Sequence, residues 1–241
     1  NRQLGYPAEA LAGMEMARFL YDSGNTVEHC ARVVVNNRSH ALANPRGAYG
    51  GETSVDAILG GHPEFAPLRA AEKAPAADGA IVLVLASREA AAVAGRRPVW
   101  IEGLSWSTDH PAIEDRDLGR AGYCEQAAAR AFAMASIDDP ESAFDFAEVD
   151  DRYAFKQLQH LEALGLCAAG ESGPKTGDGD FSRGGALPVN PSGGSLGAGH
   201  LYDAAGLYKV AESVQQLRGD AGALQIADAN RCLVQSWRGV P

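Results

Sequence analysis

The sequence predicts an α/β protein whose strands and helices alternate and are joined by crossover connections. Broad apolar stripes with helical spacing occur along the chain, as at residues 7–21 and 202–217. A run of consecutive apolar residues at 80–86 has the length of a buried strand. The 28 glycines and 12 prolines suit many tight connections between such elements.

In the first half of the chain we expect helices at residues 7–21, 26–40, 55–59 and 88–94, and a strand at 80–86. Gly24 ends the first helix. Thr26 and Ser54 suit the N-caps of the next two helices, because their hydroxyls can accept a backbone N–H. Asp78 and Gly79 form a turn that leads into the strand.

The second half repeats this alternation. We expect strands at residues 98–107, 144–149, 186–190, 223–227 and 231–237, and helices at 118–136, 153–164 and 202–217. Asp117 is placed to cap the first of these helices, and Gly219 is placed to end the last one. Residues 170–185 are rich in glycine, aspartate and serine and have no apolar period, so we expect a loop there.

The charge and hydropathy of the chain exclude two classes of function. The formal net charge is −10 at pH 7, which argues against general nucleic-acid binding, because that depends on clustered lysine and arginine. No apolar run approaches the roughly 20 residues needed to span a bilayer, so we expect no membrane span. The chain opens without a signal-peptide pattern and without methionine, which leaves open whether a segment precedes Asn1.

The cysteines and acidic residues favour neither a zinc ribbon nor a metal site. No two cysteines form a Cys-x-x-Cys pair, and their wide spacing predicts free, mostly buried thiols in a reducing compartment: Cys30, Cys124, Cys167 and Cys232. We therefore expect a cytoplasmic protein. A strand end followed by a helix start accounts for the acidic group of Asp145, Glu148, Asp150 and Asp151, and we expect no metal.

Residues 187–200 form the best candidate site. An expected strand leads into a glycine-rich turn and then directly into a helix. Backbone N–H groups at such a helix start, together with the helix dipole, suit a phosphate, a carboxylate or a developing oxyanion. The alternative is a tight connection that binds no ligand. The glycines between Gly194 and Gly199 are out of register with a dinucleotide-binding motif.

Several stretches of the chain form specific motifs in a fixed order. They are Asn-Asn-Arg-Ser-His-Ala-Leu-Ala-Asn-Pro at 36–45, the Asp-Gly-Ala strand at 77–87, Phe-Ala-Glu-Val-Asp-Asp at 146–151, and the glycine turn and helix at 190–219. Together they resemble thiolases, in the subgroup of the sterol-carrier-protein thiolases and their lipid-transfer relatives. The resemblance implies a layered α/β/α thiolase-like fold. Residues 1–96 would be the remainder of the N-terminal half, and residues 97–241 the complete C-terminal half.

The chain departs from the family pattern at positions that matter for chemistry. Thiolases place His-Pro after the glycine turn, whereas here His200 is followed by leucine and then by Tyr202 and Asp203. The family's Asn-Glu-Ala-Phe or His-Asp-Ala-Phe block is Asp-Asp-Arg-Tyr at 150–153. The residue that helps to hold a catalytic water in the family is therefore Asp150 here.

Neither of the two cysteines of thiolase chemistry is at its family position in this chain. The segment that would contain the acylated cysteine lies upstream of Asn1. Gln235 takes the position of the second cysteine, and Cys232 is about three residues early. This pattern resembles the steroid side-chain retro-aldolases of the lipid-transfer group, which keep the thiolase fold without its cysteines.

The resemblance implies a carbon–carbon lyase. It would cleave a β-hydroxyacyl-CoA, such as a steroid side-chain CoA thioester, to a ketone and a shorter acyl-CoA. The implied catalytic residues are Tyr153, Tyr202, His200 and Asp203. The implied substrate-binding residues are Asp150, Asn190, Ser192, Gly193, Gly194 and Gly199. Each has a structural alternative: the tyrosines can pack in the core, the histidine can cap a helix, and the aspartate can complement a helix dipole.

Two other functions stay open at this point. The chain could be a non-catalytic thiolase-like subunit that binds acyl-CoA, or a thiolase-type acyltransferase. The resemblance implies no cofactor other than the CoA thioester substrate. It implies a homodimer, and a partner chain with an OB-fold and a zinc ribbon, as in lipid-transfer aldolases.

Overall fold

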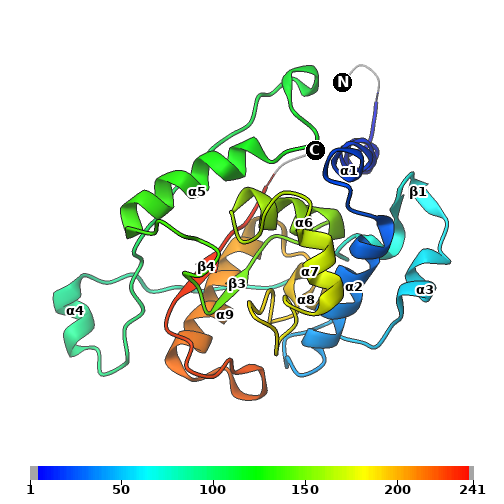
Figure 1. Ribbon diagram of the computed structural model, residues 1–241. Helices are drawn as coiled ribbons and strands as arrows, with labels where there is room; N and C mark the ends of the chain where they lie inside the picture. The colour runs from blue at the N-terminus through cyan, green and yellow to red at the C-terminus, as the bar shows by residue number, and fades with distance from the viewer. Residues whose placement is uncertain (1–4, 239–241) are drawn as a thin grey trace.

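The computed structural model describes residues 5–238 and shows helices arranged around a short parallel sheet (Figure 1). The helices are α1 (Ala8–Ser23), α2 (Val27–Ala41), α3 (Val55–Leu59), α4 (Arg88–Val93), α5 (Gly122–Ala135), α6 (Ala154–Ala163), α7 (Ser172–Asp178), α8 (Gly194–Ala198) and α9 (Ala205–Arg218). The strands are β1 (Pro63–Phe65), β2 (Leu68–Arg69), β3 (Phe146–Glu148) and β4 (Cys232–Val234). This mixture of helix and sheet confirms the predicted α/β class.

The central sheet is built on β3. It pairs in parallel with β4, in the register Phe146 to Cys232 and Glu148 to Val234. On its other side Ala147 makes a parallel bridge with Val189. The chain therefore leaves β3 at residue 149 beside the segment that leads into the glycine turn. Parallel strands place these ends at the same edge, where α/β proteins bind ligands.

The predicted helices are all present, with shifted ends. Two caps form as expected: Thr26 Oγ1 accepts the backbone N–H of His29, and Ser54 Oγ accepts that of Ala57. The helix expected from residue 118 begins at Gly122 instead, because the Asp117 carboxylate binds the backbone N–H of Gly119 in a turn. The loop expected at 170–185 contains α7, which its composition concealed.

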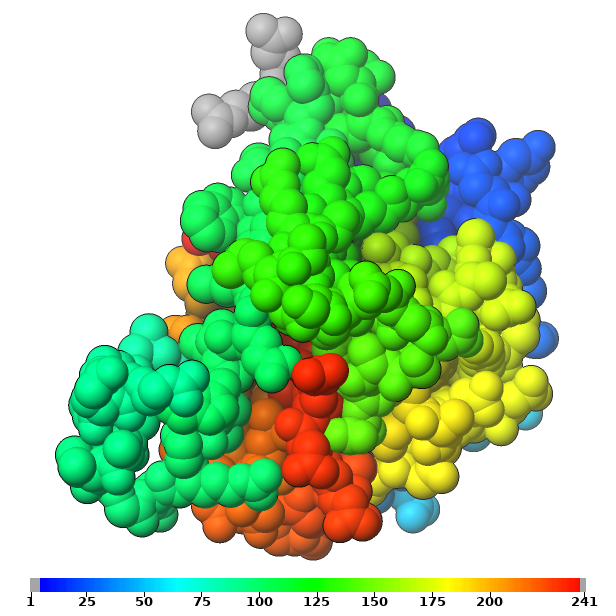
Figure 2. Space-filling model, turned by 60° about the vertical axis from the view of Figure 1, so that its left-hand side comes forward, coloured from blue at the N-terminus to red at the C-terminus, as the bar shows by residue number. Residues whose placement is uncertain are grey.

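Two long predicted strands are wrong. Residues 80–86 and 98–107 adopt no strand, and their apolar side chains lie largely in solvent, with Val84 89% and Trp106 78% exposed. The segment that includes α4 projects from the rest of the molecule (Figures 1 and 2). The physical reason is that a buried strand needs neighbouring strands for its backbone hydrogen bonds, and residues 5–238 provide none there.

The remaining strand predictions are partly correct. Residues 144–149 and 231–237 contain β3 and β4. The strand expected at 186–190 is reduced to the bridge at Val189, and residues 223–227 overlap a 3₁₀ turn at Gly222–Leu224 instead of a strand.

Two clusters of buried apolar side chains form the core. One joins α1, α2 and α6 through residues such as Phe19, Val34 and Phe155. The other joins α5, β3 and the end of α6 through residues such as Phe132 and Leu161. Because α6 contributes to both clusters, the loop between β3 and α6 is held rigidly. Over residues 5–238, each helix is too short or too polar to cross a bilayer.

Candidate functional site

A cavity of about 420 Å³ lies between the start of α6 and the segment after α8. This volume is within the range of small-molecule sites. Three of the predicted catalytic residues line it, namely Tyr153, His200 and Tyr202. The fold therefore brings together residues that are separated by about fifty positions in the chain.

The extended segment 73–77 forms the wall that joins these residues. Lys73 makes an antiparallel bridge with Tyr153, and Ala76 makes a parallel bridge with His200. The backbone N–H of Ala74 donates to the carbonyl of Arg152 at 2.8 Å, and that of His200 donates to Pro75 at 2.7 Å. Backbone hydrogen bonds therefore fix the main chain on both sides of the cavity.

Tyr153 is almost completely buried, with 2% of its surface exposed. Its ring stacks on Phe155 with a centroid distance of 6.0 Å, and the Arg152 guanidinium lies 5.4 Å from its centroid. Its hydroxyl is buried and has no hydrogen-bond partner among the described residues. Burial raises the pKa of Tyr153, so this phenol is protonated at neutral pH and can donate a proton.

His200 is also buried, with 6% of its surface exposed. Its Nδ1 is buried and has no hydrogen-bond partner within residues 5–238. Burial, followed by the charge of Arg152, lowers the pKa of His200 to about 4. The imidazole is therefore neutral at pH 7 and can accept a proton.

Tyr202 and Asp203 lie toward solvent. The Tyr202 ring is 60% exposed, and its centroid is 5.0 Å from that of His200. Tyr202 has a φ of +51°, which is rare for a bulky residue. It is the first residue of the 3₁₀ turn Tyr202–Ala204. Asp203 forms an ion pair with Arg238 at 2.7 Å and is not part of the cavity lining. A catalytic role for Asp203 stays a prediction.

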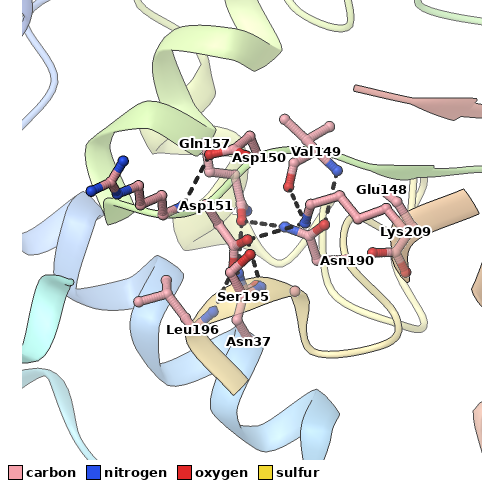
Figure 3. Close-up of polar contacts among 12 residues, drawn as sticks. Asn37, Glu148, Val149, Asp150, Asp151, Gln157, Asn190, Ser195, Leu196 and Lys209 are labelled. Atoms are coloured by element: carbon pink, nitrogen blue, oxygen red, sulfur yellow. Dashed lines mark hydrogen bonds and ion pairs between the residues drawn. The ribbon is translucent and has the colours of Figure 1, made fainter. Parts of the chain in front are cut away.

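The glycine-rich turn is occupied by a carboxylate of the protein itself (Figure 3). Asp151 accepts the backbone N–H groups of Ser195 at 2.7 Å and Leu196 at 2.9 Å. It also accepts Asn37 Nδ2 at 2.8 Å. The anion that the sequence predicts at this helix start is therefore a side chain of the chain, and sequence analysis did not assign that role to Asp151.

The predicted binding residues make internal contacts in this region. Asn190 accepts the backbone N–H of Val149 and donates to Gln157, and Ser192 Oγ donates to Glu148 at 2.8 Å. The Asp150 carboxylate accepts backbone N–H groups from residues 152 and 237. The turn glycines have positive φ values, at Gly193, Gly194 and Gly199. These contacts give each of the polar residues a structural role within the protein. A substrate-binding role for them and for the turn glycines stays a prediction.

The thiols are not part of this cavity. Burial raises the pKa of each one: of Cys30 well above its usual value, of Cys124 and Cys167 to about 12, and of Cys232 to about 11. Each is therefore held as the unreactive thiol at neutral pH. In the part of the chain that the structure describes, no three His, Cys, Asp or Glu side chains are grouped to bind a metal.

Sequence analysis missed the basic wall of the cavity. Arg38, Lys73 and Arg152 line it, with Glu9 as the acidic side chain among the lining residues. The lining thus has three basic side chains and one acidic side chain, and one of the three, Lys73, forms an ion pair with Glu64. Both arginines lie inside motifs that the sequence had singled out, at 36–45 and 150–153, and their charge was the available signal.

Comparisons with known proteins identify the family of this chain. A family described as thiolase C-terminal domain-like matches residues 105–240. The acetyl-CoA acetyltransferase of Methanothermobacter thermautotrophicus is 33% identical, over 94% of this chain and 59% of that protein. Sterol carrier protein 2 of Oryctolagus cuniculus is 33% identical, over 87% of this chain and 39% of that protein.

Among solved structures, the Ltp2-ChsH2(DUF35) aldolase superposes with a TM-score of 0.86 at 25% identity. The superposition covers 99% of this chain and 62% of that one. The chain thus spans less than two thirds of the length of the relatives it matches.

Proposed function

We propose a catalytic function for this chain, which belongs to the thiolase family and, within it, to the sterol-carrier-protein 2 subgroup. The reaction proposed is retro-aldol cleavage of a β-hydroxyacyl-CoA. The products are a ketone and a shorter acyl-CoA. The acyl group proposed is a steroid side chain or a similar branched chain.

One observation supports a ligand site with acid–base groups. Tyr153 Oη and His200 Nδ1 are both buried, and neither has a hydrogen-bond partner within residues 5–238. Both residues line the same cavity. A buried polar group without a hydrogen bond costs about 1–3 kcal/mol. Such a cost is tolerated where a ligand supplies the missing partner, and here two of these groups line the same ligand-sized space.

The protonation states assign the roles. Neutral His200 accepts the proton of the β-hydroxyl as that carbon becomes the ketone. The bond between the α- and β-carbons breaks, and its electron pair forms the enolate of the thioester. The protonated Tyr153 donates a hydrogen bond to the enolate oxygen. Tyr202, exposed beside His200, delivers a proton from solvent to the α-carbon, which completes the shorter acyl-CoA.

The likeness to an aldolase, at a TM-score of 0.86, favours a lyase over an acyltransferase. Thiolase-type transfer needs a thiolate nucleophile. The cysteines of the described residues lie outside the cavity lining, and burial raises the pKa of each, so none of these four is placed to act as that nucleophile. Acyl transfer remains the alternative, because a sequence relative is an acetyl-CoA acetyltransferase.

Product analysis tests the proposal. The natural protein is incubated with a β-hydroxyacyl-CoA whose β-carbon is tertiary, without free CoA, and separately with a 3-ketoacyl-CoA plus CoA. Equal amounts of free ketone and shorter acyl-CoA in the first incubation are expected. Products only in the second would assign an acyltransferase. Binding without products in either would assign a non-catalytic acyl-CoA-binding subunit.

We also propose that the chain works in an assembly. Apolar side chains at 80–86 and 98–107 are exposed, and unpaired apolar strands of this kind are normally covered. The aldolase that superposes on this chain with a TM-score of 0.86 has two named components. We propose a homodimer that also binds an OB-fold, zinc-ribbon partner. Light scattering at micromolar concentration is expected to show a dimer or larger species. A folded monomer would contradict this.

A further inference from the structure

We propose that Arg38 is a third catalytic group in this cavity and that its guanidinium stabilises the enolate oxygen of the thioester. The inference rests on the retro-aldol reaction proposed above. It assigns a positive charge for the enolate to a residue of the 36–45 motif, to which neither the resemblance nor the protonation argument gave a role.

The position of Arg38 is fixed by its surroundings. It lies on α2 next to Asn37, whose amide is held by Asp151 and Gln157 at 2.8 Å each. Its own carbonyl accepts the backbone N–H of Gly51 at 3.1 Å. At the end of the side chain, Nη2 donates to the carbonyl of Ala71 at 3.4 Å. The backbone of Arg38 and the end of its side chain therefore each have a hydrogen-bond partner.

One N–H donor of the Arg38 guanidinium has no acceptor among the described residues. This donor is the buried Nε. It thus joins Tyr153 Oη and His200 Nδ1, and all three of these residues line the same cavity. Arg38 also forms no ion pair with a described carboxylate, whereas the neighbouring Lys73 pairs with Glu64.

A cation at this place suits the chemistry. Cleavage of the carbon–carbon bond moves a full negative charge toward the thioester oxygen. Tyr153 and His200 are neutral at pH 7, so they donate or accept hydrogen bonds without supplying a compensating charge. A buried anion without compensation is strongly disfavoured. Arginine stays protonated even where burial lowers its pKa, as it does for Arg38.

The proposed interaction grows as the reaction proceeds. The thioester oxygen of the substrate has only a partial charge, whereas the enolate oxygen has nearly a full one. An interaction that strengthens toward the transition state raises kcat more than it changes KM. A residue that merely anchored a permanent anion of the substrate, such as a CoA phosphate, would change KM instead.

The test compares Arg38→Gln and Arg38→Lys with Arg32→Gln, an exposed arginine on the same helix. For Arg38→Gln we expect kcat to fall about 100-fold or more, the scale of one lost oxyanion donor, with KM within a few-fold. Arg38→Lys, which keeps the charge, is expected to retain more activity, and Arg32→Gln to match the wild type. An unchanged kcat, or a rise in KM alone, would overturn the inference.

A binding measurement keeps the inference separate from the proposed function. The probes are a nitronate analogue of a CoA thioester enolate and its neutral thioether counterpart, titrated calorimetrically into each variant. Arg38→Gln is expected to weaken nitronate binding about 100-fold and to leave thioether binding unchanged. This outcome does not depend on turnover. If wild type binds both probes equally, Arg38 is not an enolate site, whatever reaction the protein catalyses.

Discussion

Lys209 Nζ lies 3.2 Å from Asp151 Oδ1, and both side chains are completely buried. Lys209 comes from α9 and Asp151 from the segment after β3, and the same lysine donates to the carbonyl of Val149 at 2.9 Å. Asp151 in turn holds the N–H groups at the start of α8. The pair therefore ties α9, the segment after β3 and the start of α8 together, as Figure 3 shows.

Breaking this pair is expected to destabilise the protein strongly. Lys209→Met would leave Asp151 as a buried carboxylate without its cation, at a cost of about 3–5 kcal/mol. The free energy of unfolding is measured by urea denaturation. The control is Arg120→Met, which removes an exposed ion pair with Glu125 and should cost about 0–1 kcal/mol. Equal losses in the two variants would show that burial does not decide the contribution of Lys209.

Adding a methyl group at Gly193 in the glycine turn is expected to destabilise the protein. Gly193 has φ +99°, and a Cβ there would lie 2.9 Å from the Cα of Ala41 on α2. Gly219 has φ +82° but faces open space, which makes it a matched control. Gly219→Ala should cost about 1–2 kcal/mol from its left-handed backbone alone. Gly193→Ala should lose roughly 1–3 kcal/mol more through overpacking. Similar urea midpoints for both variants would contradict this packing.

Removing the hydroxyl of Tyr153 is expected to lower the cleavage activity without lowering the stability of the protein. Tyr153→Phe keeps the ring packing on Phe155 and deletes a hydroxyl that has no partner among the described residues. Carbon–carbon cleavage should fall by about 100-fold or more. The melting temperature should stay the same or rise, since an unsatisfied buried group is lost. Release of shorter acyl-CoA and thermal melting are measured on the same sample.

Tyr202→Phe is expected to lower cleavage on the same scale, about 100-fold, by removing the proposed proton donor. Its exposed ring makes little difference to stability. Acyl-CoA affinity should be unchanged, because both hydroxyls act mainly in the transition state. If both tyrosine variants cleave at the wild-type rate, the lyase proposal loses its acid groups and the binding-subunit alternative gains support.

His200 is expected to set the acid limb of the pH–rate profile. Its pKa of about 4 means that the neutral base is present above that pH, so kcat/KM should fall as the pH drops through about 4. The same shift affects stability. Between about 4 and the usual value of 6.5, the unfolded state binds more protons than the folded state, so stability rises with pH across that window.

A variant and a control test this assignment. His200→Gln should flatten the pH dependence of the unfolding free energy between pH 4 and 6.5 and should abolish most cleavage. His110→Gln removes a histidine whose side chain is 54% exposed and lies outside the cavity lining, and it should leave cleavage unchanged. An acid limb that persists in His200→Gln would assign that limb to another group.

The sequence by itself determined most of the helices. Their apolar period is local, and so are the caps that Thr26, Ser54 and Gly219 provide, so no distant contact was needed to predict them. The sequence also determined which residues are chemically notable, because Tyr153 and His200 lie in specific motifs that resemble those of thiolases. Both of these residues do line one cavity.

The tertiary structure decided what surrounds those residues. Only the folded chain brings the segment 73–77 between Tyr153 and His200, places Arg38 on the same cavity, and fills the glycine turn with Asp151. It also decided that 80–86 and 98–107 are not strands. The physical reason is common to all of these cases. Strand pairing, burial and the satisfaction of polar groups depend on partners far away in the chain, whereas a helix closes its hydrogen bonds within four residues.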